Sequence, residues 1–203
     1  MEFTLLYEGE LLPSGGSNSR AKEKHAIRRS FHPQLRRLWG LRSLAEQHSI
    51  PKLTESVAST KEDRIKLGLT TIGESWRNAE YQFVPLVTAK MELRCSLDIT
   101  LLRPEEDRFI FTSGDIDGQV KTIFDALKMP ASRGEAGGIG PQEDETPFFC
   151  LLEDDRLISE VRVAADQLLL LPNHRGVKAN DAHVVIQVKV NHKNPRTFDN
   201  YFG

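Results

Sequence analysis

Apolar residues recur at helical spacing in two parts of the chain. The first part follows Pro33 and carries Leu35, Leu38, Leu41, Leu44 and Ala45. The second covers Asp117 to Met129 and carries Val120, Ile123, Phe124 and Leu127. Residues three and four positions apart share one face of a helix. Both parts are therefore predicted to be amphipathic helices, and Pro130 is predicted to end the second.

Alternating or continuous apolar runs indicate strands elsewhere. A long strand is predicted from Val87 to Leu102, because alternate residues from Leu93 to Leu101 are apolar. The polar turn after it predicts a returning strand from Arg108 to Thr112 and an antiparallel hairpin. Further strands are predicted over three ranges: Phe3 to Tyr7, Arg156 to Ala164 and Ala182 to Asn191.

Three segments have weaker patterns. Lys61 to Leu69 and Glu74 to Tyr81 are each predicted as helical patches. Ala131 to Pro147 is rich in Gly and acids, so it is predicted to be a flexible surface loop. Together the elements predict one α+β domain over residues 1–203, with a single mixed β-sheet and helices packed on it.

Composition narrows the class of protein without naming a function. Of the residues, 39% are hydrophobic and 28% are charged, as in ordinary globular proteins. Neither a basic signal segment nor a membrane-length apolar run is present, so we expect a soluble, cytoplasmic protein without a membrane partner. Cys95 and Cys150 lack the spacing of a zinc site and are expected to be reduced and buried.

The charge is unevenly distributed along the chain. Eight Lys and Arg residues lie between Arg20 and Arg42, against the single acid Glu23. Such a segment can meet a polyanion. The residues predicted to contact phosphates are Lys24, Arg28, Arg29, Arg36 and Arg37. The alternative is an ordinary solvated face of a helix.

Acidic residues form the most specific pattern. Asp115 and Asp117 can share a face, and Lys121 lies one helical turn beyond Asp117. The pair Asp154-Asp155 opens a later predicted strand. Clustered carboxylates repel one another unless a cation lies among them, and carboxylates are ligands for Mg²⁺ or Mn²⁺. The alternative is structural: Asp117 caps a helix, Asp115 lies in a turn and the later pair marks a hairpin tip.

Two other metal or phosphate motifs begin in the same way. Phosphatases of the haloacid-dehalogenase type share Asp-x-Asp-Gly but have Thr or Val at the position of Gln119. An EF-hand calcium loop requires an acid at its twelfth position, where this chain has Ala126. The pattern therefore favours neither of them.

The same residues resemble the RusA family of Holliday junction resolvases. The family pattern is Asp-x-Asp-Asn, a lysine, Phe/Leu-Asp-Ala-Leu and then an Asp-Asp that starts a strand. Here these blocks are Asp115 to Leu127 and Asp154 to Val163, in the same order. The resemblance implies that Asp115, Asp117 and Asp155 bind Mg²⁺ or Mn²⁺ and that Lys121 is the catalytic lysine.

The resemblance also implies a RusA-like fold and a homodimer that cuts four-way DNA junctions in recombination and repair. The chain departs from the family at three places: Gly118 replaces the asparagine, the link from Leu127 to Asp154 is long, and the helical region over about 33–82 is enlarged. An alternative function is therefore a catalytically weakened module that binds branched DNA or a protein partner without cutting.

Overall fold

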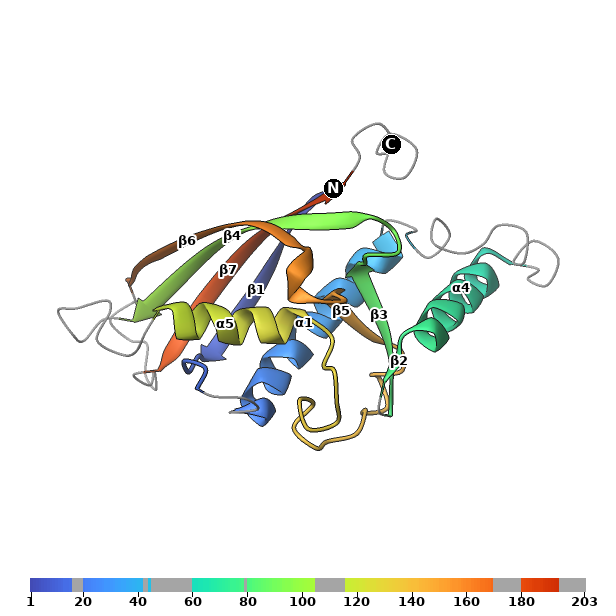
Figure 1. The fold of residues 1–203 in the computed structure, drawn as a ribbon, viewed down its shortest axis with the longest axis horizontal. Helices are drawn as coiled ribbons and strands as arrows, with labels where there is room; N and C mark the ends of the chain where they lie inside the picture. The colour runs from blue at the N-terminus through green and yellow to red at the C-terminus, as the bar shows by residue number, and fades with distance from the viewer. Residues whose placement is uncertain are drawn as a thin grey trace.

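The elements combine helices and strands in an α+β arrangement (Figure 1). The computed structural model describes residues 1–15, 20–41, 44, 60–78, 80–104, 116–169 and 180–193. The α+β class expected from the sequence is confirmed. The strands form two sheets, one of four strands and one of three, and the expectation of a single sheet is wrong.

The larger sheet has the strand order β1-β7-β4-β6. Its strands are β1 (Glu2–Glu10), β7 (Asp181–His192), β4 (Leu93–Pro104) and β6 (Ile158–Leu168). β7 lies antiparallel to both β1 and β4, whereas β6 lies parallel to β4. The alternating apolar residues from Leu93 to Leu101 all point into the core, as their spacing predicts.

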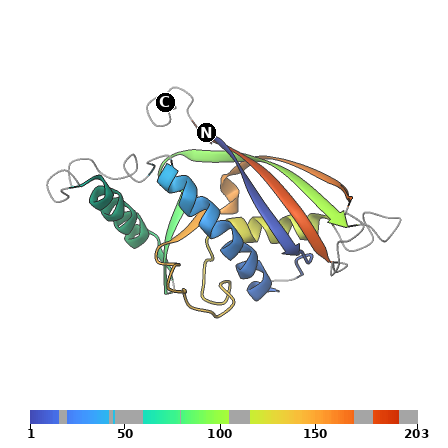
Figure 2. The same cartoon turned by 180° about the vertical axis from the view of Figure 1, so that it is seen from behind.

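Helices cover one face of this sheet. α1 (Ala21–Leu41) and α5 (Ile116–Leu127) lie on the same side of it, as Figures 1 and 2 show from opposite directions. Together with the inward residues of the strands, their buried side chains form the main core. The apolar positions of α5 lie at i, i+3, i+4 and i+7, and this periodicity sets its orientation.

The smaller sheet joins two segments that are far apart in the chain. It contains β2 (Arg77–Asn78), β3 (Tyr81–Val87) and β5 (Phe148–Leu152). β3 and β5 are parallel and almost fully buried, so β5 and the part of β3 from Phe83 to Val87 are continuously apolar rather than alternating. α4 (Lys61–Ser75) lies beside β3 (Figure 1).

Three predicted segments have different structures. The strand expected from Val87 to Leu102 begins only at Leu93, because Val87 is the last residue of β3. The patch Glu74 to Tyr81 is not a helix: α4 ends at Ser75, and β2 and the start of β3 follow. α1 begins at Ala21 and contains Pro33, so the helix does not start after this proline. The buried apolar stripe of α1, from Ile27 through Phe31 and Leu35 to Trp39, outweighs the hydrogen bond that a proline removes.

The returning strand expected at Arg108 to Thr112 lies outside the described residues. β4, its expected hairpin partner, has β7 along one edge and β6 along the other. The antiparallel partner of β4 is thus β7, which lies about eighty residues later in the sequence. Turn residues in the sequence indicate pairing between successive strands, but they do not indicate pairing between strands this far apart in the chain.

The segment from Ala131 to Pro147 has no regular helix or strand, but it packs against the protein. Ala136 is fully buried within the second apolar cluster, and Glu145 is 3% exposed. The expectation of a surface loop is therefore wrong for these two residues. Tyr81 donates a hydrogen bond to the carbonyl of Ile139, which fixes the middle of the segment.

Other sequence-based expectations concern the cysteines and membranes. Cys95 and Cys150 are unpaired and buried, as expected. Within the described ranges, every helix is too short or too polar to cross a membrane.

Candidate active site

The two sequence blocks that carry the family resemblance lie against each other in the fold. The first forms α5, and the second forms the short 3₁₀ helix η1 (Asp155–Leu157) and the start of β6. Lys128, the residue after α5, donates a hydrogen bond to Asp155, with 3.2 Å between Nζ and Oδ2. This ion pair thus joins two residues that are 27 positions apart in the sequence.

Lys128 also links Asp155 to a second carboxylate. Its Nζ lies 3.5 Å from Oδ1 of Asp125, and Lys24 Nζ lies 2.8 Å from the other oxygen of Asp125. Partial burial lowers the pKa of Lys128, but together the negative charges of Asp155 and Asp125 raise it by more than burial lowers it. The net shift of this pKa is therefore upward. Lys128 therefore remains an ammonium ion at neutral pH.

Asp154 has a different role from Asp155. Its carboxylate accepts hydrogen bonds from the backbone N–H and the guanidinium of Arg156, and it caps η1. The side-chain hydrogen bond from Arg156 is the main reason that the pKa of Asp154 falls to about 2. Asp154 thus has a structural role, but as the cap of η1 and not at the expected hairpin tip, because β5 and β6 belong to different sheets. Asp155 is the carboxylate directed at Lys128 and the end of α5.

The other predicted site residues lie at the start of α5 or before it. Asp117 is in the first turn and Lys121 follows one turn later, both with exposed side chains. Asp115 lies outside the described residues. The helix rise places Asp117 about 12 Å from Asp125 along the axis. Asp155 is therefore paired toward the C-terminal end of α5, roughly two turns from Asp117.

The donor chemistry fits a hard divalent cation. Asp117 is exposed and Asp155 is 39% exposed, so hydrated Mg²⁺ or Mn²⁺ can reach both carboxylates. Among the described residues, which exclude Asp115, no three His, Cys, Asp or Glu side chains are grouped closely enough to hold a metal ion. Because about two turns of α5 separate Asp117 from Asp155, the two carboxylates can share one ion only if η1 moves along α5 toward Asp117.

Gly118 has a packing reason to lack a side chain. A Cβ at this position would lie 2.9 Å from Cβ of Pro13, closer than real Cβ contacts. The segment after β1 crosses this turn, with Ser14 N donating to the carbonyl of Gly118 at 2.8 Å. Thr122 Oγ1 also donates to the carbonyl of Leu12. In this chain, Pro13 and the backbone of Ser14 occupy the space that a side chain at position 118 would need.

Three of the predicted phosphate contacts are used inside the protein. Lys24 is 8% exposed and pairs with Asp125, and Arg28 is 2% exposed. Arg29 is half-buried and forms a bidentate pair with Glu145, at 2.6 and 3.0 Å. Buried and already paired cations are not available to DNA phosphates, so the predicted basic surface does not include these residues.

Arg28 instead caps the C-terminal end of α5. Its guanidinium donates to the carbonyls of Lys128, at 2.9 Å, and Asp125. The last carbonyls of a helix lack partners within the helix, and a cation is favourable at this end of its dipole. Burial lowers the pKa of Arg28 to about 10, which leaves it charged at neutral pH. This buried cation helps to fix the helix that carries Asp117 and Lys121.

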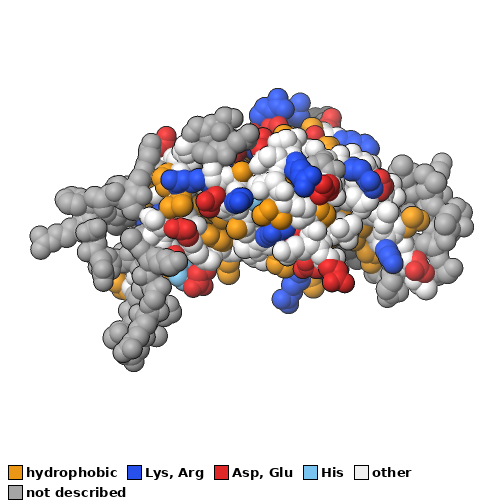
Figure 3. Space-filling model, turned by 90° about the horizontal axis from the view of Figure 1, so that it is seen from below, with side chains coloured by type: hydrophobic (Ala, Val, Ile, Leu, Met, Phe, Trp, Pro, Cys, Tyr) orange, Lys and Arg blue, Asp and Glu red, His pale blue; other side chains and the backbone are white. Residues whose placement is uncertain are grey.

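Arg36 and Arg37 remain on the surface. Both are exposed on the C-terminal half of α1. Figure 3 shows one face of the molecule, on which Lys and Arg side chains are interspersed with Asp and Glu. Arg36 and Arg37 are thus the predicted phosphate contacts that the fold leaves accessible.

The motif residues singled out in the sequence do not include Asp125 or Lys128 as site residues. A signal for them exists in the spacing, because Asp117, Lys121, Asp125 and Lys128 follow one another at three- or four-residue intervals. This spacing puts alternating charges along one face of α5. The contact between this face and Asp155, however, is visible only in the fold.

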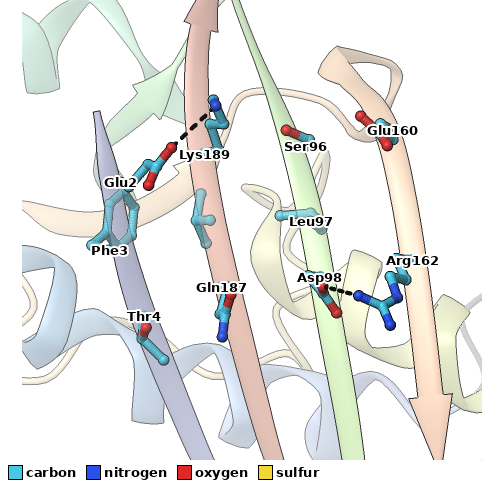
Figure 4. Close-up of a pocket in the computed structure, with 11 residues that line it drawn as sticks. Glu2, Phe3, Thr4, Ser96, Leu97, Asp98, Glu160, Arg162, Gln187 and Lys189 are labelled. Atoms are coloured by element: carbon cyan, nitrogen blue, oxygen red, sulfur yellow. Dashed lines mark hydrogen bonds and ion pairs between the residues drawn. The ribbon is translucent and has the colours of Figure 1, made fainter.

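A shallow pocket of about 580 Å³ lies on the face of the larger sheet opposite the helices (Figure 4). Four of its five charged side chains are paired across strands: Arg162 with Asp98 at 3.2 Å, and Lys189 with Glu2 at 3.1 Å. Glu160 is the fifth charged side chain. The pocket is therefore a weaker candidate for a functional site than the face formed by α5 and η1.

Comparison of the chain with family models gives no match, and comparison with curated proteins gives none.

Proposed function

We propose that the protein is a metal-dependent endonuclease that cuts four-way DNA junctions, as the resemblance to the RusA family implies. The observation that carries the proposal is the contact between α5 and η1. Two blocks that resemble the family in sequence also adjoin in space, with Lys128 and Asp155 3.2 Å apart. Lys128 directly follows the first block and Asp155 lies in the second, so their contact joins the two blocks at the C-terminal end of α5.

In this proposal Asp115, Asp117 and Asp155 hold Mg²⁺ or Mn²⁺ on the exposed side of α5. A divalent ion there supplies Lewis-acid chemistry, by polarising a phosphate oxygen and making a bound water more acidic. Lys121 is exposed one turn from Asp117 and directs its ammonium group toward charge that develops on the phosphate or the departing oxygen.

DNA would be held mainly through its backbone phosphates. Arg36 and Arg37 on α1 are the proposed contacts, since Lys24, Arg28 and Arg29 are engaged inside the protein. A homodimer would supply two such sites for paired nicks in a symmetric junction. The proposed substrate is therefore branched DNA and the proposed partner a second copy of the chain.

The test is cleavage of a synthetic four-way junction in Mg²⁺ or Mn²⁺. The parent protein is compared with Asp117→Asn and Asp155→Asn, which keep side-chain shape but remove charge. Asp166→Asn is the matched control, because it removes an exposed carboxylate from β6 far along the strand from η1. We expect paired nicks from the parent and the control, and at least a hundredfold loss of cleavage rate (~10²) in the two site variants.

Junction binding is measured in parallel by gel mobility shift. Binding without cleavage in both site variants, with cleavage by the parent, would support the nuclease. Binding by all four proteins without any nicks would favour the alternative module, which recognises branched DNA but does not cut it. Absence of both binding and cleavage would remove branched DNA as the substrate.

A further inference from the structure

The two edges of the larger sheet differ in what faces their backbone. At the β1 edge, Gln34 of α1 bonds both backbone groups of Leu6: its Oε1 accepts from the N–H at 2.9 Å, and its Nε2 donates to the carbonyl at 2.7 Å. At the other edge, β6 has a strand neighbour on its β4 side alone, among the strands that the structure describes. Alternate backbone groups of an edge strand point away from the sheet and can pair with another strand. A side chain thus closes the β1 edge at Leu6, and β6 presents the edge that can accept a further strand.

The N-terminal half of β6 is exposed on both faces. Its residues from Ser159 to Arg162 are exposed in succession, although neighbouring side chains of a strand point to opposite faces. On one face Val161 is apolar and yet 40% exposed. On the other face Glu160 and Arg162 lie two positions apart (Figure 4). Arg162 contacts Asp98 within the chain, whereas Glu160 forms no ion pair with any residue that the structure describes.

This part of β6 is complementary to a second copy of itself. Opposed residues of an antiparallel pair share a face of the sheet, so a two-fold axis relating two β6 strands must pass through a residue. With the axis at Val161, Glu160 of each copy lies opposite Arg162 of the other, and the two Val161 side chains meet on the other face. An axis at Glu160 or at Arg162 would instead oppose like charges. Charge and apolar surface therefore select the register centred on Val161.

We infer that the protein forms a two-fold dimer through antiparallel pairing of its β6 strands about Val161. The partner is a second copy of this chain, and the pairing joins the two larger sheets into one. Two cross-strand ion pairs and one apolar pair favour this register, and backbone hydrogen bonds supply the contact along the edge. The inference rests on the proposed function in that it names the surface of the homodimer, but it involves neither a metal ion nor DNA.

Charge reversal tests the ion pairs, with the dimer dissociation constant of the full chain measured by sedimentation equilibrium. Glu160→Arg opposes arginines at two places and should weaken dimerisation roughly tenfold or more. Exchange of the two charges, by Glu160→Arg with Arg162→Glu, should recover the affinity to within about threefold. The exchange is made together with Asp98→Asn, because Asp98 would repel a glutamate at position 162, and Asp98→Asn alone is its reference. Glu143→Arg reverses an exposed charge elsewhere and should leave dimerisation unchanged.

A cysteine at the axis tests the register directly. Opposed residues of an antiparallel pair have Cα atoms about 4.5 to 5.5 Å apart, which a disulfide can span. Val161→Cys should therefore form a covalent dimer under oxidising conditions, seen on a non-reducing gel. Leu6→Cys on β1, where the native side chain is 57% exposed, is the control and should not cross-link. Cys95 and Cys150 are buried and do not compete.

The outcomes separate this interface from the nuclease. Weaker dimerisation of Glu160→Arg, its recovery by the exchange and cross-linking of Val161→Cys support the interface, provided that circular dichroism shows each variant folded. A parent chain that is monomeric at about 100 µM, or a dimer that neither responds to Glu160→Arg nor cross-links through Val161→Cys, overturns it. A dimer of this kind that leaves four-way junctions uncut keeps the interface and refutes the nuclease, whereas a monomer that cuts them refutes the interface alone.

Discussion

The two halves of α1 have similar basic sequences but opposite environments. In the N-terminal half, Lys24 and Arg28 are buried and Arg29 is bound to Glu145. In the C-terminal half, Arg36 and Arg37 are exposed. The difference follows from the helical stripe that faces the core, which runs from Ile27 to Trp39.

Basic residues beside that stripe are drawn inside only where the fold supplies partners. Arg28 meets the unpaired carbonyls at the end of α5, and Lys24 meets Asp125. A buried charge without such partners would cost several kcal/mol (~3 or more). The number of basic residues in a stretch of sequence thus does not tell how many of them lie on the surface. Whether a basic residue is buried depends on the partners that the element packed against α1 offers.

The largest effect expected from this comparison is on folding. Arg28→Met removes three hydrogen bonds and leaves two carbonyls at the end of α5 without partners, so the free energy of unfolding should fall by about 3 to 5 kcal/mol. Arg36→Met is the matched control and should change it by less than about 0.5 kcal/mol. Urea unfolding followed by circular dichroism measures both. Equal effects of the two substitutions would contradict the contrast between the halves.

The second prediction concerns the pair that ties α1 to the segment from Ala131 to Pro147. Glu145→Gln should reduce the free energy of unfolding by about 2 to 3 kcal/mol, because Arg29 loses its bidentate partner. The control is Glu80→Gln, which breaks an exposed pair with Arg133 and should cost no more than about 1 kcal/mol. Similar losses of unfolding free energy in both variants would mean that the buried pair stabilises the protein no more than the exposed pair does.

The third prediction concerns pH. His25 accepts a hydrogen bond from Arg28 and bonds to Tyr81 through its other nitrogen, so it is buried as the neutral form. Burial, with a further contribution from Arg28, lowers the pKa of His25 to about 3. Below the unfolded pKa of about 6.5, the unfolded chain binds the extra proton, so stability falls as pH falls toward 3.

Between pH 7 and pH 5, His25 should lower the free energy of unfolding by about 2 kcal/mol. His32 acts in the same direction, because burial lowers its pKa as well. Urea titrations at several pH values give the slope. His25→Gln should reduce this slope, and an unchanged slope in His25→Gln would refute the assignment.

Substitutions in the exposed half of α1 are expected to have the smallest effect on folding. They are expected to have a separate effect on DNA binding. Replacing Arg36 and Arg37 by Met should lower the slope of log K against log salt for junction binding by about one for each lost phosphate contact. The measurement is fluorescence anisotropy with a labelled junction at several salt concentrations. Lys66→Met is the control on α4, and a slope equal to that of the parent would exclude α1 from the DNA surface.

The spacing of apolar residues correctly predicted the elements that bury one face along their whole length. The amphipathic spacing in α5 and the alternation in β4 each correspond to one buried face. The smaller sheet was not predictable in this way, because β3 and β5 are buried on both sides and contain no period to read. Their pairing joins residues just after the enlarged helical region, from Phe83 to Val87, to the long link between Leu127 and Asp154.

The candidate site was predictable to a similar extent. Residue type and spacing singled out Asp117, Lys121 and Asp155. The ion pair of Lys128 with Asp155 and the cap that Arg28 gives to α5 depend on contacts between distant segments. Such contacts are set by the packing of α1 and η1 against α5, which the sequence pattern alone does not contain.

The most direct test of the account is a crystal structure of the full chain soaked with Mn²⁺, in which the anomalous signal locates the ion. The account predicts one ion bound by both Asp117 and Asp155, with η1 moved along α5 toward Asp117 and the ion pair between Asp155 and Lys128 broken. An ion bound at Asp117 alone, or no bound ion, with the pair between Lys128 and Asp155 intact, would contradict it.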